Sequence, residues 1–347
     1  MGQLRIRVWA RVLLGVLMGL VLTLSWVSGV GLAESPDQSA MLSAPSSSNT
    51  NDPPVLPYAY ARVVTHNVLV YETTGITPVR SLGAGYVWVS LAHSRPITLN
   101  EQAWYVINEN EYVRADQLSP FTPSTFQGIT LTDTPVQPFA WLVFDMWASA
   151  APGVPAGSGA PLFKRYTLVT IFEEQPVGDR FWYRIGPDQW LEQGNLGIVK
   201  PIARPQEIGP NDQWIEINLY EQTLAAYEGD RMVYATLVSS GLPYWQTPPG
   251  LFRVWVKVQQ GKMSGRDGYP DYYYLEDVPW TLYFNGPVAL HGAYWHDKFG
   301  LRHSHGCVNL TPKDALWLFN WATPVTSRYN YTLATEENPG TWVWVHE

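Results

Sequence analysis

The chain has 347 residues, of which 46% are hydrophobic, 14% aromatic and 15% charged, a composition that excludes an intrinsically disordered protein. At about 100–200 residues per domain the length predicts two or three domains. The 28 prolines and 28 glycines favour a turn-rich, all-β build over long helices. The formal net charge of -8 argues against nucleic acid as the main partner.

The first 33 residues have the layout of an export segment. Three arginines precede an uncharged, mostly apolar run at 12–32, and small residues close it at Gly31 and Ala33. The segment 1–33 is predicted to be a cleaved signal peptide or, because the run is longer than a usual signal core, an N-terminal membrane anchor. The rest of the chain is then expected to be exported to the cell envelope, periplasm or cell wall, with membrane contact only through this segment.

Two similar units follow a predicted flexible linker at 34–56, which is rich in Ser, Pro and Asn. The Trp-Tyr-x-Ile pattern at 104–107 recurs at 182–185, and the matched positions after it keep the same offset of 78. Short apolar runs broken by Gly, Pro and Asn predict small β-barrels. The two units, 57–122 and 135–200, resemble bacterial SH3-like domains, which implies binding to the cell wall or a spacer role.

The third region, 208–345, is expected to be mostly β. Apolar and polar residues alternate over 215–219 and over 251–258, which predicts two strands. Gly229-Asp230 lies between two apolar runs and predicts a two-residue hairpin turn. The stretches 123–134 and 201–207 are expected to link the three folded units.

One short helix and one long loop complete this region. Thr311 is a suitable N-cap, Pro312 fits the first helical position and Asp314 the third. The Gly- and Tyr-rich stretch 259–277 is too long for a tight turn, so it predicts a binding loop or a lid.

Cys307 is the single cysteine of the chain, so no internal disulfide can form. A lone thiol in an exported protein is exposed to oxidation, which suggests a chemical role, and a buried structural cysteine is the alternative. Four of the seven histidines lie between His291 and His305. A histidine can take the thiol proton, and a turn containing Gly306 can present backbone N–H groups to an oxyanion. The pattern predicts a Cys–His acyl-transfer site.

A metal site is the weaker alternative. His296, His303, His305 and Cys307 are possible ligands, but their spacing does not match a familiar zinc pattern and paired CxxC elements are absent. Arg302 and His303 add positive charge beside the nucleophile, which would either lower the thiol pKa or face solvent.

The stretch from His291-Gly292 to Ser-His-Gly-Cys-Val-Asn at 304–309 resembles the catalytic domain of the YkuD-type L,D-transpeptidases. Support comes from 214–224, which resembles the opening hairpin of that family, and from Thr-Pro-Pro-Gly-Leu-Phe at 247–252. The resemblance covers roughly 208–325. Papain-like and NlpC/P60 peptidases place the cysteine before the histidine, and sortases have a different sequence around the cysteine.

The resemblance implies a cysteine-dependent enzyme of peptidoglycan biosynthesis and cell-wall organisation that needs no metal or organic cofactor. Cys307 would attack the carbonyl before the fourth-position D-alanine of a stem peptide, and His291 would be the general base, oriented by the Gly292 carbonyl. Backbone N–H groups of Gly306 and Cys307 would hold the oxyanion. A second stem would then give a 3→3 cross-link. The residues expected to shape the site or contact substrate are His305, Ser304, Asn309, Tyr294 and Trp280.

The resemblance also implies sensitivity to carbapenems and leaves two alternatives. With water as acceptor, the same thiol would make a carboxypeptidase or a cross-link hydrolase, because acceptor-site shape and water exclusion decide between them. A non-catalytic wall-binding scaffold is the other, and the intact pair of His291 and Cys307 argues against it. The expected fold is two small SH3-like β-barrels before a mostly-β catalytic domain with a short helix.

Overall fold

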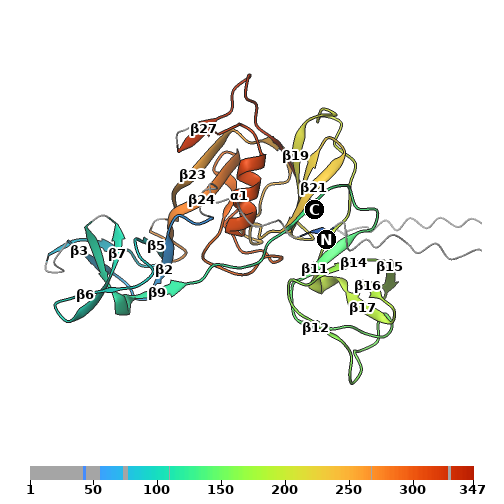
Figure 1. Ribbon diagram of the computed structural model, residues 1–347, viewed down its shortest axis with the longest axis horizontal. Helices are drawn as coiled ribbons and strands as arrows, with labels where there is room; N and C mark the ends of the chain where they lie inside the picture. The colour runs from blue at the N-terminus through green and yellow to red at the C-terminus, as the bar shows by residue number, and fades with distance from the viewer. Residues whose placement is uncertain (1–41, 44–54, 73–76, 109, 267, 327–329) are drawn as a thin grey trace, which may run out of the picture. The chain divides into compact units, whose positions relative to one another are not determined.

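The structure is a computed structural model that describes residues 42–43, 55–72, 77–108, 110–266, 268–326 and 330–347. The predicted export segment and nearly all of the predicted linker lie outside these residues. All of the described residues belong to one compact unit of the chain. The described residues form a mostly-β fold with one short α-helix, which confirms the predicted fold class (Figure 1). No helix among them is long and apolar enough to cross a membrane.

The first unit is a group of short, mainly antiparallel strands around its own apolar cluster. Val68 and Val70 point into this cluster and are fully buried, whereas Leu69 between them is exposed, as strand alternation requires. The elements are β2 (Ala59–Val63), β3 (Val68–Tyr71), β4 (Pro78–Leu82), β5 (Tyr86–Leu91), β6 (Ile97–Leu99), β7 (Gln102–Asn108), β8 (Glu111–Arg114), the 3-10 helix η2 (Ala115–Gln117) and β9 (Leu118–Phe121).

The second unit repeats the end of the first. The run β7, β8, η2 and β9 recurs as β16, β17, η3 and β18, each starting 78 residues later, so the repeat found in the sequence is also a structural repeat. The SH3-like character of both units stays a prediction. The elements are β11 (Phe139–Leu142), β12 (Met146–Trp147), β13 (Leu162–Phe163), β14 (Leu168–Thr170), β15 (Glu173–Val177), β16 (Arg180–Gly186), β17 (Gln189–Glu192), η3 (Gln193–Asn195) and β18 (Leu196–Val199).

The third region contributes strands to two sheets and carries the helix α1, which packs on β24 and β25. One sheet has the order β1-β10-β21-β20-β19-β28-β22, and the other contains β26-β25-β24-β5-β2-β9 with β23 also paired to β24. The remaining elements are β1 (Leu42–Ser43), β10 (Ile129–Leu131), β19 (Gln213–Asn218), β20 (Thr223–Glu228), β21 (Arg231–Leu237), β22 (Gly250–Arg253), β23 (Val256–Gly265), β24 (Tyr273–Asn285), β25 (Val288–Gly292), β26 (Val308–Leu310), α1 (Pro312–Trp321), β27 (Tyr331–Leu333) and β28 (Trp342–His346).

Two local predictions in this region are confirmed. The hairpin between β20 and β21 turns at Gly229, whose φ of 59° is in the left-handed region that glycine tolerates. The helix begins at Pro312, and the Thr311 side chain accepts a hydrogen bond from the Asp314 N–H at 3.2 Å. Both features depend on neighbours in sequence, which is why the sequence was sufficient to find them.

Two other predictions were wrong. The stretch predicted as one strand over 251–258 is two strands, β22 and β23, interrupted at Val254 and Trp255. The predicted loop over 259–277 is largely a long hairpin, because β23 continues to Gly265 and β24 begins at Tyr273. Its Gly, Gln and Tyr residues lack a clear apolar alternation, and the strands are stabilised by pairing with neighbours distant in sequence.

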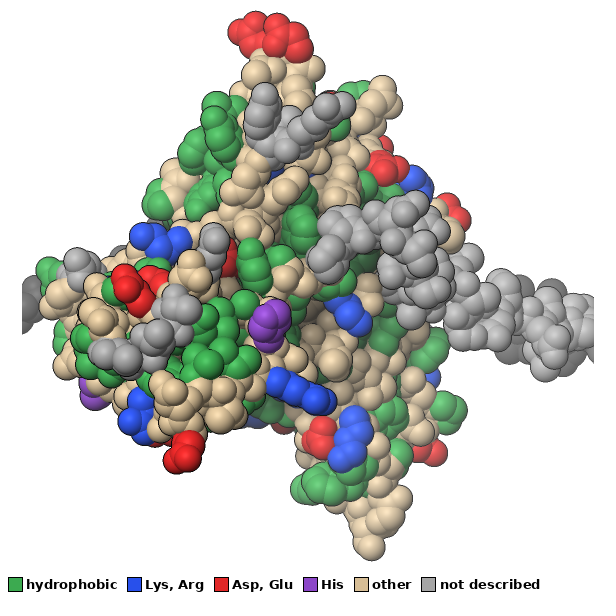
Figure 2. Space-filling model, turned by 60° about the vertical axis from the view of Figure 1, so that its left-hand side comes forward, with side chains coloured by type: hydrophobic (Ala, Val, Ile, Leu, Met, Phe, Trp, Pro, Cys, Tyr) green, Lys and Arg blue, Asp and Glu red, His purple; other side chains and the backbone are tan. Residues whose placement is uncertain are grey.

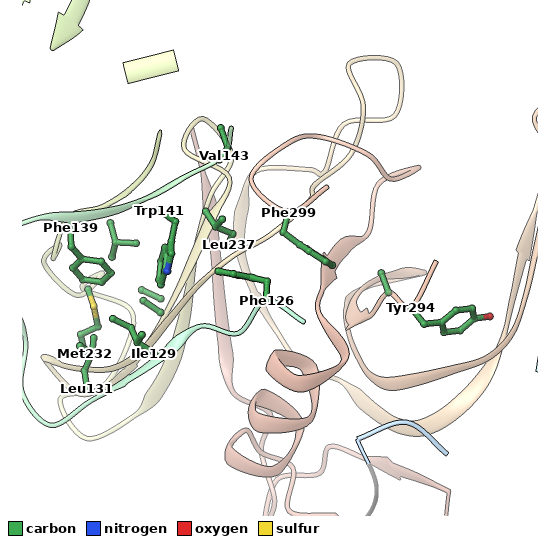
Figure 3. Close-up of a cluster of buried hydrophobic side chains, with 14 of the residues drawn as sticks. Phe126, Ile129, Leu131, Phe139, Trp141, Val143, Met232, Leu237, Tyr294 and Phe299 are labelled. Carbon is green, nitrogen blue, oxygen red and sulfur yellow. The ribbon is translucent and has the colours of Figure 1, made fainter. Parts of the chain in front are cut away.

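The predicted linker at 123–134 is a structured part of the fold. Residues Ile129–Leu131 form β10, which pairs with β21 of the third region. Phe126 is buried, and its ring lies 5.8 Å from that of Trp141 in the second unit. In Figure 3, Phe126 lies among side chains of the second unit and the third region, with Leu237 and Phe299 nearby. This segment therefore joins the core instead of leaving the units free.

The first unit is joined to the third region through a continuous sheet. Strand β5 pairs in parallel with the start of β24, with Tyr86 opposite Tyr273. The Tyr86 N–H donates to the Tyr272 carbonyl at 2.9 Å, and the Tyr60 ring stacks on Tyr294 with centroids 3.5 Å apart. The two aromatic rings are 1% and 0% exposed, so this contact is part of the hydrophobic core.

Asp314 offers a test of how the linker, the helix and β21 depend on one another. Its buried carboxylate accepts hydrogen bonds from the Gly128 N–H and from the Tyr234 and Thr236 hydroxyls. We expect Asp314→Ala to lower the free energy of unfolding by about 3 kcal/mol, because three buried donors lose their acceptor. Urea denaturation would measure this. Asp116→Ala, at an exposed ion pair, should leave the midpoint unchanged, and equal midpoints for both variants would contradict the proposed role.

Candidate functional site

The predicted nucleophile and base lie on one face of two neighbouring strands. Strands β25 and β26 run parallel, and His291 is opposite Asn309 in their register. Cys307 precedes β26 and is two residues before Asn309, so alternation directs both side chains to the same face. The register therefore brings together a histidine and a cysteine that are 16 positions apart in sequence.

Both residues line a cavity of about 430 Å³. Its walls come from the third region, from the tip of the β23–β24 hairpin and from the first unit. Cys307 is half-buried and His291 is 3% exposed. The lining residues are Arg62, Gly85, Tyr86, Leu242, Met263, Pro270, Asp271, Tyr272, Tyr273, Leu275, His291, Trp295, His303, Ser304, His305, Cys307 and Asn309.

The turn before Cys307 has a conformation that depends on glycine. Gly306 has a φ of 122°, which a residue with a Cβ rarely adopts, and its carbonyl accepts a hydrogen bond from Thr247 at 2.8 Å. The Ser304 hydroxyl spans the turn, since it donates to the Cys307 carbonyl and accepts from the Gly306 N–H at 3.1 Å. Ser304 therefore shapes the turn. The Gly306 N–H, predicted to hold an oxyanion, is already engaged, which leaves the Cys307 N–H as the candidate donor.

Burial keeps both reacting groups neutral. Loss of water around Cys307 raises its thiol pKa, and a hydrogen bond from the Ala289 backbone offsets this only in part. Burial lowers the pKa of His291 to about 4, and the Gly292 backbone opposes that shift. At neutral pH the resting pair is therefore a thiol and an uncharged imidazole, not the thiolate–imidazolium pair that a Cys–His site suggests.

Orientation of the His291 ring by Gly292 stays a prediction. The Gly292 backbone lies close enough to the ring to raise its pKa, while Nδ1 has no partner among the described residues that meets the full geometry of a hydrogen bond. Gly292 has a different constraint. A Cβ there would lie 3.0 Å from the Pro279 ring and 3.3 Å from Pro312, so a side chain at this point would push its neighbours by a few tenths of an ångström.

The positive charge expected beside the thiol is absent. Arg302 is turned to the Leu219 carbonyl at 3.0 Å and to Glu347 at 3.4 Å. His303 lines the cavity, but burial lowers its pKa to about 4, so it is neutral at physiological pH. His305 is exposed, and its ring lies 4.3 Å from that of Trp245. Burial raises the thiol pKa, so of the two alternatives left open for Arg302 and His303 the structure does not favour a lowered thiol pKa.

Asn309 has a buried partner that the sequence did not suggest. Its amide nitrogen lies 2.8 Å from Nε2 of His296, whose Nδ1 accepts from the Lys298 N–H at 3.1 Å. A neutral ring that accepts at Nδ1 must carry its proton at Nε2, so the Asn309 oxygen is the atom that should face it. This orientation also gives the amide oxygen the partner that it otherwise lacks. His296 therefore holds Asn309 in place beside the cavity.

Two predicted contact residues lie in the core instead. Tyr294 is fully buried against Tyr60, and its hydroxyl donates to the Glu276 carbonyl at 2.6 Å. Trp280 is 8% exposed and packs against Phe319. Neither lines the cavity, which argues against the predicted contact of these two side chains with substrate there. Aromatic residues in a β-rich domain usually fill the core, and these two follow that rule.

The structure also adds cavity residues that the sequence analysis missed. Arg62 and Tyr86 come from the first unit, far from the motif in sequence, and no local pattern marks them. Trp295 lies inside the motif region but was not singled out. Tyr272 and Tyr273 belong to the Tyr-rich stretch that the sequence predicts to be a binding loop or a lid. In the part of the chain that the structure describes, no group of three His, Cys, Asp or Glu side chains is arranged to hold a metal ion.

Comparisons with known proteins identify the domain in which these residues lie. Residues 212–345 match the family model of the L,D-transpeptidase catalytic domain, YkuD. The YciB protein of Bacillus subtilis (strain 168), named for a proposed L,D-transpeptidase activity, is 30% identical over 120 residues, which cover 30% of this chain and 59% of YciB. The match thus spans less than two thirds of that relative.

Two solved structures are also similar. An L,D-transpeptidase from Stackebrandtia nassauensis is 25% identical with a TM-score of 0.29, over 40% of this chain and 58% of its own. The catalytic domain of the Enterococcus faecium enzyme is 26% identical with a TM-score of 0.32, over 39% of this chain and 98% of its own. Because both scores are below 0.5, the assignment of 212–345 to this domain family rests on the sequence match.

The neutral resting state of the thiol can be measured directly, because the chain has a single cysteine. We expect alkylation of Cys307 by iodoacetamide to speed up with pH and to be half-maximal at a higher pH than for an ordinary exposed cysteine, since burial raises the thiol pKa. Intact-mass spectrometry between pH 5 and 10 would follow the reaction, with His291→Gln as a comparison. A constant fast rate down to about pH 5 would instead indicate a resting thiolate–imidazolium pair.

Proposed function

We propose that this chain, whose residues 212–345 form a YkuD-type L,D-transpeptidase catalytic domain, uses Cys307 to transfer peptidoglycan stem peptides and forms 3→3 cross-links. The observation that carries the proposal is the shared cavity: His291 lines it from β25, and Cys307 lines it from the turn immediately before the adjacent parallel strand β26. The neutral imidazole suits this chemistry because only an unprotonated ring can accept the thiol proton.

The first half-reaction is the acylation of Cys307. Its sulfur forms a bond to the carbonyl carbon between the third-position diamino acid and D-alanine, while the thiol proton moves to His291. The carbonyl oxygen becomes an oxyanion, for which the Cys307 N–H is the candidate donor. The bond to the D-alanine nitrogen then breaks. His291 returns the proton to that nitrogen, so free D-alanine leaves and a thioester remains.

The second half-reaction releases the thiol. The side-chain amine of another stem attacks the thioester carbonyl and loses a proton to His291 as its bond to carbon forms. The carbon–sulfur bond breaks, and His291 gives the proton to the departing sulfur, which restores the neutral pair. Water in place of the amine would give a shortened stem, the carboxypeptidase outcome.

We infer that the reaction takes place outside the cytoplasmic membrane. Support comes from the basic start and uncharged run of residues 1–33, the pattern of an export segment. Wall binding by the two upstream units stays a prediction.

The test of the nucleophile and base uses the protein with a tetrapeptide-stem muropeptide. We expect a covalent adduct and release of D-alanine, both abolished in Cys307→Ala and slowed at least 100-fold in His291→Gln, since general-base catalysis contributes about 10²–10⁴-fold. His303→Gln is the matched control, because it removes another neutral histidine from the same cavity. Intact-protein and product mass spectrometry would report both steps.

Particular outcomes would contradict the proposal. D-alanine release by Cys307→Ala would exclude the thiol, and equal losses in His291→Gln and His303→Gln would exclude a specific base. The product mass separates the acceptors: a dimer indicates transpeptidation, and a stem shortened by one residue with no dimer indicates hydrolysis.

The pH dependence of acylation follows from the two pKa shifts. His291 must be unprotonated, so the rate should fall as pH drops toward about 4. The rate should stay level across neutral pH, because the thiol is protonated until the pH passes its raised pKa. Single-turnover acylation between pH 3.5 and 9 would measure the profile. In His291→Gln the residual rate should instead climb with pH, as expected for an unassisted thiolate, and a profile identical to that of the unmodified enzyme would remove His291 from the mechanism.

A further inference from the structure

The first unit contributes a wall of the cavity that contains Cys307. Arg62 of β2 and Gly85 and Tyr86 at the start of β5 all line it. Gly85 lies so close to the hairpin tip that a Cβ there would be 2.5 Å from the Tyr272 carbonyl. The Tyr86 N–H bonds that same carbonyl. These contacts hold the first unit against the hairpin, so its side chains at the cavity have a defined position.

Among the residues that the structure describes, Arg62 is the charged cavity residue without an ion-pair partner. Asp271, the other charged lining residue apart from histidines, is paired with Arg266 at 2.9 Å. Within the described part of the chain, the Arg62 guanidinium makes no hydrogen bond or ion pair. It lies over the Tyr86 ring, 5.3 Å from the centroid, and its side chain is exposed.

The charge balance in the cavity favours an anionic ligand. His291 and His303 are neutral at physiological pH and add no positive charge, and the carboxylate of Asp271 is neutralised by its partner. Figure 2 shows basic side chains and exposed histidine near the middle of one face, with acidic side chains mainly toward its margins. A guanidinium stacked on an aromatic ring keeps its N–H groups available for two parallel bonds to a carboxylate.

The internal repeat indicates that packing does not require an arginine here. When the units are aligned through Tyr60-Ala61-Arg62 and Phe139-Ala140-Trp141, Arg62 corresponds to Trp141. Trp141 is 2% exposed and belongs to the hydrophobic core. The same strand position is therefore compatible with a large apolar side chain, and in the first unit it instead places a cation at the cavity.

We propose that Arg62, supported by Tyr86, is a binding subsite for a carboxylate of the stem peptide, so that the first unit is part of the substrate cleft. The inference rests on the proposed function, since it names a contact of that substrate. A stem peptide carries carboxylates both at its C-terminal D-alanine and at internal residues. The shared chemistry is the carboxylate, and amidation at one place or the other distinguishes them.

The test measures peptide binding, which does not depend on turnover. The full chain carrying Cys307→Ala would be titrated calorimetrically with a tetrapeptide stem, with its C-terminal amide, and with a form amidated at the internal carboxylates. We expect adding Arg62→Gln to weaken binding of the unmodified peptide about 10- to 100-fold, the usual effect of losing a charge-assisted bond. It should have little effect on whichever amidated peptide already lacks the bound carboxylate.

Two controls keep the result specific. Arg95→Gln removes another exposed arginine of the first unit that does not line the cavity, and should not change affinity. Arg62→Lys keeps the positive charge but cannot make two parallel hydrogen bonds to a carboxylate. Its peptide affinity should lie between that of the protein with Arg62 and that of Arg62→Gln. Unchanged affinity in Arg62→Gln, an equal loss for all three peptides, or no binding of any peptide to the Cys307→Ala protein would overturn the subsite.

The proposed function is judged separately, by D-alanine release from the unmodified chain. Release together with peptide affinities that do not depend on Arg62 would reject the subsite alone. Arg62-dependent binding without release would support the subsite as a peptide-binding contact and reject the catalytic role.

Discussion

The site depends on strand β24, which is paired along its length with three other strands. Its end pairs with β25, which carries His291, its start pairs with β5 of the first unit, and β23 runs beside it as the other arm of the hairpin. Because β25 in turn pairs with β26, the turn bearing Cys307 belongs to the same sheet. One hydrogen-bonded sheet therefore positions His291, the turn with Cys307 and two walls of the cavity. These parts of the site do not depend on separate loops. This rigidity is what a positioned nucleophile and base require.

The chemistry of the cavity follows from removing water around that framework. A lone thiol oxidises readily when it is ionised, because the thiolate is the reactive form. Burial raises the Cys307 pKa and lowers that of His291, so in the resting state the proton is on sulfur. The same desolvation that protects the thiol also keeps the histidine ready to accept a proton. Burial therefore keeps the proton on sulfur and leaves the imidazole unprotonated, and the same pair of pKa shifts opposes transfer of that proton in the resting state.

The sequence predicted what is encoded locally and missed what depends on distant pairing. The helix cap at Thr311, the Gly229 turn and the motif around Cys307 are contiguous, so their chemistry can be read directly. The sequence predicts a loop where the long hairpin lies, because the residues of its two strands lack a clear apolar alternation. Arg62 could not be found at all, since it reaches the cavity only because β5 pairs with a strand nearly two hundred residues later. The predicted substrate contact of Tyr294 has a different explanation. Proximity to a motif in sequence does not decide whether a side chain faces the cavity or the core.

The repeat shows how two units of similar local structure acquire different places in the molecule. Tyr60 and Phe139 occupy equivalent positions, both are 1% exposed, and both belong to the same core cluster as the third region. Burying an aromatic ring of this size contributes about 2 kcal/mol or more, so each unit is held by its own anchor and not only by its linker. Only the first unit, however, extends the sheet that carries His291, through β5 and β24. A spacer would need neither the anchor nor the shared sheet. The first unit has both and also presents a charged side chain to the cavity, and a mechanism for this protein has to include it.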